Sequence, residues 1–195
     1  TSGYDGASQL TGLTYTQGAT VLGTLTYAYD AEGCRIAVGG TWARTSLPQA
    51  VAMATYNADN QQRTFGTQTL TQDRNGSVTT LTAPAGPTTY TWDARQQLVA
   101  LTGPGLTASF AYDGLGRRTR KTVNGLTTTV LADGVTPVQE HTPGAGTATL
   151  LTGLGADEYF TRTDATGTAT LLSDALGSTL ALTDPAGMVR TTYTY

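Results

Sequence analysis

Large and small residues alternate along several short stretches of the chain. The clearest are TYAY (26–29), TTYTW (88–92), SFAY (109–112) and TYTY (192–195). Side chains two residues apart on an extended strand point to the same face, so this pattern predicts strands with aromatic residues on one face and small residues on the other.

Aspartate and glycine recur between these stretches at a fixed spacing. In D-x-x-G, the Asp carboxylate can accept a backbone N–H at the start of a turn, and the Gly can adopt the left-handed conformation that leads into the next strand. Trp92-Asp93 keeps only the first half of the motif. The six full copies are Asp30–Gly33, Asp73–Gly76, Asp113–Gly116, Asp164–Gly167, Asp174–Gly177 and Asp184–Gly187.

Other turn signals fill the intervals, including PAGP (84–87), GPG (103–105), NG (124–125) and PGAG (143–146). From Asp73 onward a turn signal recurs about every ten residues, which fits a strand of four to six residues plus a turn. The sequence therefore predicts an all-β fold, a repetitive antiparallel β-hairpin ribbon of roughly fifteen to twenty strands.

One segment is ambiguous. Residues 46–59 could form a short helix, with Ser46 as its cap and Pro48 in its first turn. Their alanines also alternate with Val51 and Met53, which is equally typical of a strand.

Composition supports the β interpretation and narrows the function. Threonine is the commonest residue, there are 24 glycines, and charged residues make up 13%. A net charge of −3 gives no general attraction to nucleic acid or anionic membranes, and no apolar run is long enough to span a bilayer. Cys34, expected half-buried in a strand, and His141, expected in a surface loop, are each alone, which disfavours a disulfide, a zinc site or a His-based triad.

Candidate chemistry is sparse, and each candidate has a structural alternative. Asp174 and Asp184 could be a glycosidase-like acid pair, but successive turns would place them at opposite ends of one strand, about 20 Å apart. Each D-x-x-G turn offers calcium one carboxylate, whereas calcium needs six to eight oxygens. Trp42 could stack on a sugar ring or pack inward. The basic run 117–121 could clamp a phosphate, or could form a solvated strand with Arg117, Thr119 and Lys121 on one face. We expect no catalytic residue, metal or cofactor.

The stretches YAYDAEGCR (27–35) and FAYDGLGRR (110–118) resemble the YD repeat of Rhs proteins. Degenerate copies are GYDGASQL (3–10), YNADNQQR (56–63) and YTWDARQQL (90–98), in which Tyr29, Trp92 and Tyr112 are the aromatic residues directly before Asp. Residues 171–195 resemble the closing part of an Rhs core, and the repeats are weaker over 34–89.

This resemblance implies one repeat array over residues 1–195, curving into a segment of a spiral β-shell. Such shells belong to large secreted or surface proteins, and in toxins they enclose an effector. The resemblance therefore implies an extracellular, non-catalytic structural segment whose partners are neighbouring repeats, copies of itself or an enclosed effector. The alternatives are an adhesin or glycan-binding module, with Trp42 as a stacking residue, and a hydrolase that uses Asp pairs. Because the array is cut in mid-repeat at both ends, we also expect either a longer chain or assembly of copies into a filament or tube.

Overall fold

The structure, a computed structural model, describes residues 1–43, 50, 51, 53–155 and 158–194, and it contains nineteen β-strands and no helix within those residues. The strands are β1 (Ser2–Tyr4), β2 (Leu10–Gln17), β3 (Thr20–Tyr29), β4 (Arg35–Gly39), β5 (Ala54–Tyr56), β6 (Gln62–Phe65), β7 (Gln68–Gln72), β8 (Val78–Ala83), β9 (Gly86–Trp92), β10 (Leu98–Gly103), β11 (Leu106–Tyr112), β12 (Arg118–Val123), β13 (Leu126–Asp133), β14 (Thr136–Thr142), β15 (Gly146–Thr152), β16 (Tyr159–Asp164), β17 (Gly167–Ser173), β18 (Thr179–Thr183) and β19 (Val189–Thr192).

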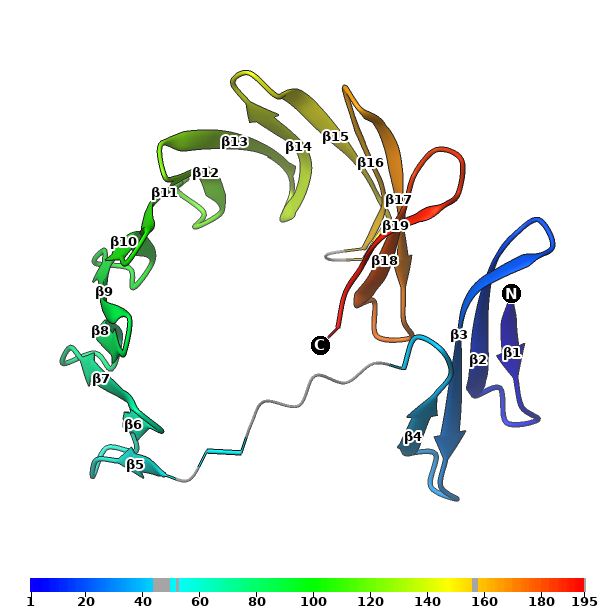
Figure 1. Cartoon of the computed structure of the whole chain (residues 1–195), viewed down its shortest axis with the longest axis horizontal. Coiled ribbons are helices and arrows are strands. Elements are labelled where there is room, and N and C mark those ends of the chain that lie inside the picture. Colours follow the sequence, from blue (N-terminus) through cyan, green and yellow to red (C-terminus); the bar gives the residue numbers. More distant parts are fainter. Residues whose placement is uncertain (44–49, 52, 156–157, 195) are drawn as a thin grey trace. The chain divides into compact units, whose positions relative to one another are not determined.

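Within each of two sheets, every strand pairs with its neighbours in the sequence. Strands β1 to β4 form one sheet, and β5 to β19 follow one another in chain order in a second sheet (Figure 1). The pairs between neighbouring strands are antiparallel, for example β9 with β10 and β11 with β12. The predicted all-β hairpin-repeat fold is thus confirmed.

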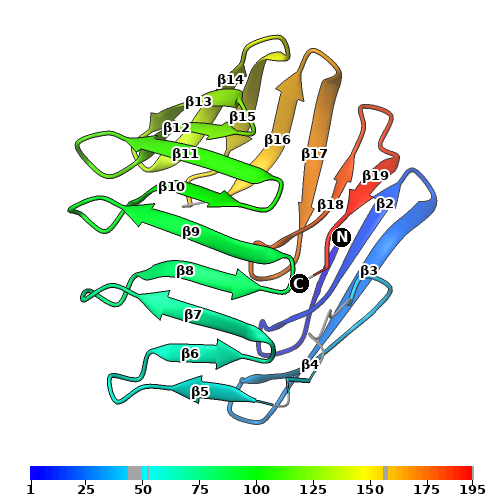
Figure 2. The ribbon, with the colours of Figure 1, turned by 60° about the vertical axis from the view of Figure 1, so that its left-hand side comes forward.

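The chain divides into two compact units. The first comprises Thr1–Leu47 together with Ala148–Tyr195, and the second is Pro48–Thr147. Within the second unit, successive strands run in opposite directions, so the connections lie alternately along the two borders that the strand ends form (Figure 2). We call each of these borders an edge of the ribbon. One edge of the ribbon carries the loops that begin at Asn57, Asp73, Asp93 and Asp113. The other edge carries two-residue turns such as Asn124-Gly125.

The second unit has two chemically different faces, as the alternation predicts. Cross-strand partners on one face form a row of hydroxyl side chains across five strands: Thr71, Thr80, Thr89, Thr102 and Thr107. On the other face, Leu101 lies between Tyr90 and Ala108, and Ala108 is only 8% exposed. Period-two patterning therefore places Tyr90, Leu101 and Ala108 on the face opposite the threonine row.

The first unit has the main hydrophobic core. Leu25, Tyr27 and Trp42 from the N-terminal segment pack with Leu180 and Ala181 of β18. Trp42 stacks on Tyr15 with a centroid distance of 5.5 Å, and Gly23 makes room for its indole ring, since a Cβ there would lie 2.1 Å from Cε2. Trp42 is 6% exposed, so this burial leaves no open ring face for a sugar and argues against the predicted stacking role.

Three further expectations concern the possible helix over 46–59, the burial of Cys34 and the loop position of His141. Ser46 and Pro48, the proposed helix start, lie outside the described residues, and β5 and the following turn occupy 54–60 instead of a helix. Cys34 is exposed at the end of a turn, because β4 begins one residue later. His141 is exposed but belongs to β14, with Nδ1 3.0 Å from the Thr147 hydroxyl.

Candidate functional site: the loop edges and an adjacent pocket

One five-residue loop geometry recurs eight times in the described part of the chain, and we call it the Asx loop, with positions one to five. At Asp113, for example, Oδ1 accepts the backbone N–H groups of Leu115 (2.9 Å) and Arg117 (3.0 Å). The Asp113 N–H donates to the Arg117 carbonyl, and the Gly116 N–H donates to the Asp113 carbonyl. The same bonds occur in the loops that begin at Asp5, Asp30, Asn57, Asp73, Asp93, Asp113, Asp174 and Asp184.

The fourth position of these loops has a left-handed backbone whatever residue occupies it. Five loops have glycine there, at Gly33, Gly76, Gly116, Gly177 and Gly187, with φ between 79° and 88°. In the degenerate loops Ser8, Asn60 and Gln96 adopt φ of 62°, 59° and 61°. The side-chain and backbone bonds of position one therefore fix the loop even where the residue at position four resists it.

Asp164 departs from the pattern that its D-x-x-G motif predicts. It ends β16 and pairs directly with Gly167, so only two residues form the turn. Its Oδ1 accepts the backbone N–H of Thr166 at 2.8 Å and the hydroxyl of Thr166 at 2.6 Å. Because the strand pairing continues to Asp164 itself, the fifth loop residue is missing from this turn.

At four of the eight Asx loops named above, the residue directly before the loop reaches back toward the preceding loop on the same edge. Its side chain donates a hydrogen bond to the backbone carbonyl of the residue that follows that preceding loop. The pairs are Tyr29 Oη to Leu10 O (2.9 Å), Gln72 Nε2 to Gln62 O (2.6 Å), Trp92 Nε1 to Val78 O (2.7 Å) and Tyr112 Oη to Leu98 O (2.9 Å). Tyr29, Trp92 and Tyr112 therefore each join their own turn to the neighbouring turn as well as packing on the sheet.

Tyr29, Trp92 and Tyr112 can be found from sequence as the residues before Asp, but Gln72 could not be found by an aromatic pattern. It occupies the same place and supplies the same donor with its carboxamide. Its Oε1 is buried and has no hydrogen-bond partner among the described residues. Glutamine thus substitutes for tyrosine at the cost of one unsatisfied acceptor.

The basic run 117–121 is divided by the turn. Arg117 occupies loop position five, where its Nε donates to Asp113 Oδ2 at 2.7 Å and its Nη1 donates to the Gly134 carbonyl. Backbone and side-chain hydrogen bonds from Arg117 lower the pKa of Asp113. Arg118 lies over the Phe110 ring at 5.7 Å from its centroid. The bulge at Ala111/Tyr112 shifts the register, so the predicted strict alternation from Arg117 to Lys121 is not observed.

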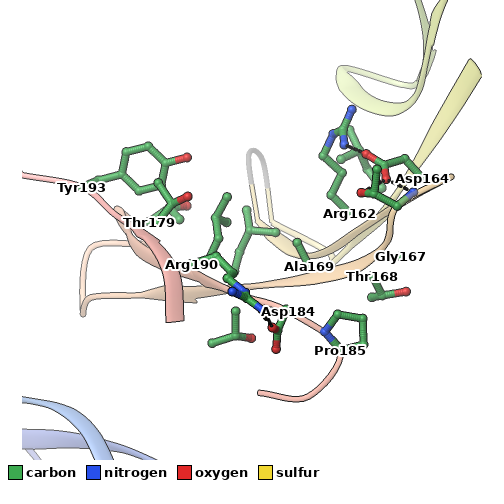
Figure 3. A pocket seen from close by; sticks show the side chains of 16 residues that line it. Arg162, Asp164, Gly167, Thr168, Ala169, Thr179, Asp184, Pro185, Arg190 and Tyr193 are labelled. Carbon is green, nitrogen blue, oxygen red and sulfur yellow. Dashed lines mark hydrogen bonds and ion pairs between the residues drawn. The ribbon is translucent and has the colours of Figure 1, made fainter. Parts of the chain in front are cut away.

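A pocket of about 520 Å³ lies in the first unit on one face of the strands from β15 to β19 (Figure 3). Its apolar lining includes Leu150, Ala169, Leu171 and Leu182. Two ion pairs also line it, Arg162 with Asp164 and Arg190 with Asp184. Its size and its combination of apolar walls with a few polar groups are typical of ligand pockets.

Both pocket carboxyl groups are held in the charged form. Hydrogen bonds from Thr166, followed by that from Arg162, lower the pKa of Asp164 to about 2. The Met188 backbone N–H, with a further contribution from Arg190, lowers the pKa of Asp184. A general acid at neutral pH needs a raised pKa, so these two carboxylates are suited to holding their turns rather than to proton transfer.

The candidate acid pair Asp174 and Asp184 is not brought together in this pocket, since only Asp184 lines it. Their loops lie at the two ends of β18, as the sequence predicts, and Asp174 lines two other cavities of the first unit. Within the described residues, no cluster of three or more His, Cys, Asp or Glu side chains could hold a metal, and none of the described elements is a helix that could cross a bilayer.

The fold and the Asx loops define an antiparallel hairpin-repeat ribbon. No protein-family model and no curated protein matches the chain. Solved structures do: the crystal structure of TcdB2-TccC3-Cdc42 (16% identity, TM-score 0.54), the crystal structure of TcdB2-TccC3-TEV (15%, 0.58), and the Photorhabdus luminescens Tc holotoxin pore with a mutation in TccC3 (14%, 0.53). These matches cover 96–100% of this chain, but the chain spans only 14% of the length of those chains. At such identities the likeness shows a shared fold.

Proposed function

We propose that this chain is a non-catalytic structural segment of a secreted Rhs-type β-shell, whose wall is the hairpin ribbon and whose lumen can enclose an effector polypeptide. The main support is the Asx-loop edge. Its side chains bond successive turns at four places, as expected of a wall element, and the fold matches chains of solved structures, among them a Tc holotoxin pore, over 96–100% of this chain.

The electrostatics support the non-catalytic part of this proposal. The pocket aspartates pair with arginines and accept hydrogen bonds from backbone N–H groups of their own turns. Their carboxylate oxygens therefore stabilise these turns. The burial of Trp42 favours a wall segment over a glycan-binding module, since its ring is part of the core. An extracellular location follows from the shell interpretation and is part of the proposal.

Cryo-electron microscopy of the natural polypeptide that carries this segment tests the wall role. We expect a hollow particle whose wall is one sheet thick. Protease treatment of the intact particle should spare any enclosed segment until the wall is opened by acid or denaturant. A solid particle without a lumen would overturn the shell proposal.

A screen with chromogenic glycosides and esters tests the non-catalytic part separately. No turnover is expected. Turnover that is lost in Asp184→Asn and Asp164→Asn, but retained in the loop control Asp73→Asn, would contradict it, whatever the particle looks like.

A further inference from the structure

A glutamine side chain lies against the fourth-position glycine of a neighbouring Asx loop in three separate places. In each case the glutamine holds position five of the preceding loop on the same edge, namely Gln9, Gln61 and Gln97. A methyl group added at the facing glycine would lie 3.0 Å from Gln9 Nε2 at Gly33, 3.3 Å from Gln61 Nε2 at Gly76, and 3.0 Å from Gln97 Nε2 at Gly116. In the third pair, Nε2 of Gln97 also donates to the Gly116 carbonyl at 3.3 Å.

The same contact recurs between segments far apart in the sequence. Gln17, at the end of β2, lies on Gly187 of the Asp184 loop, where an added methyl group would be 3.1 Å from its Cγ and its Nε2. Gln17 Nε2 donates to the Ala186 carbonyl in that loop, 169 residues away. A glutamine of the N-terminal sheet thus lies on a C-terminal loop glycine in the same way that Gln9, Gln61 and Gln97 lie on the loop glycines of their own sheets.

Only a glycine with this backbone conformation leaves room for the glutamine carboxamide to lie against the loop. Its positive φ presents the loop carbonyls at the surface, and the missing Cβ lets a flat carboxamide approach them closely. A carboxamide supplies the N–H donor without a charge, so its partial burial costs less than that of lysine or arginine. Tyrosine hydroxyls bond the Asp174 loop and the residue before it instead: Tyr15 donates to the Ser173 carbonyl, and Tyr27 accepts from the Ala175 N–H.

We propose that the contact between a glutamine side chain and a fourth-position glycine is what recognises an Asx loop on this edge. Gln17 makes this contact with the Asp184 loop, and it thereby docks the β1–β4 sheet on that loop. The partner that fits such a loop is therefore a β-strand carrying a carboxamide. Gly177 in the Asp174 loop is the matched case without this contact, since nothing among the described residues lies within 4 Å of an added Cβ.

The docking can be measured with a thiol placed in the interface. Ala181 is fully buried in the core between β18 and the N-terminal segment, so Cys34→Ser/Ala181→Cys provides a parent whose single thiol is labelled only when the sheet opens. Gly187→Ala and Gly177→Ala add the same group at the same loop position, with φ of 79° and 84°, but only the first meets Gln17.

We expect Gln17→Ala and Gln17→Glu, which lacks the donor, each to raise the labelling rate about five- to ten-fold, the effect of one lost hydrogen bond with its contacts. Gly187→Ala should do the same and Gly177→Ala should not. In the Gln17→Ala background, Gly187→Ala should cause little further increase. Equal rates for the two glycine variants, full protection in Gln17→Glu, or independent effects of Gln17→Ala and Gly187→Ala would each overturn the proposal. If Gly187→Ala fails to fold, the two Gln17 variants decide alone, because neither changes the loop.

Discussion

Replacing Gln72 with tyrosine should stabilise the hairpins around β7. Gln72 donates to the Gln62 carbonyl at 2.6 Å but leaves its own Oε1 buried without a partner among the described residues. An unsatisfied buried acceptor costs about 1–3 kcal/mol. Tyrosine has no second polar atom, and its hydroxyl reaches the equivalent carbonyl at Tyr29 and Tyr112. We therefore expect Gln72→Tyr to raise the free energy of unfolding by about 1 kcal/mol, which is about 2–4 °C in Tm for a chain of this size.

The matched control is Gln72→Phe, which supplies the ring without the hydroxyl. It removes the unsatisfied Oε1 but also removes the side-chain donor to the Gln62 carbonyl, so it should be about 1 kcal/mol less stable than Gln72→Tyr. Urea unfolding gives the overall values, and hydrogen exchange of the β6–β8 amides locates the effect. Equal stability of the Phe and Tyr variants, or a Tyr variant less stable than the natural chain, would refute this account.

Three further predictions concern the Asx loops and the pocket. Gln96→Gly should stabilise the folded chain by about 0.5–1 kcal/mol in a thermal melt. The strain of a side chain at φ of 61° is larger than the cost of glycine's extra freedom in the unfolded chain. A loss of stability would contradict this. Tyr112→Phe should destabilise by about 1 kcal/mol in urea unfolding, since it removes the 2.9 Å bond to Leu98 and keeps the ring, and an unchanged midpoint would show that the hydroxyl contributes nothing. Melting temperatures should be level above about pH 4 and fall toward pH 2. The reason is that folding lowers the pKa of Asp113, Asp164 and Asp184 below the usual 3.8, so the stability that these carboxylates contribute is lost as acid protonates them. A constant Tm down to about pH 2 would contradict this.

Much of the fold could be read from local patterns. The alternation of TTYTW (88–92) and the Asp-to-Gly spacing reflect interactions within a few residues, which sequence displays directly. Trp42 could not be placed this way, because its burial depends on Tyr15, Gly23 and a strand about 140 residues further along the chain. The misread turn at Asp164 shows a second limit, since strand pairing and not the motif decides how many residues a turn contains.

The loop-to-loop bonds also bear on how such chains diverge in evolution. Each bond from Tyr29, Gln72, Trp92 or Tyr112 ends on a main-chain carbonyl, which every amino acid possesses. Mutation can therefore change the accepting residue without removing the acceptor, while the donor and the Asx residue beside it are the side chains on which these four bonds depend. A lineage of such ribbons can replace most of its sequence while the backbone geometry persists, which fits a common fold at 14–16% identity.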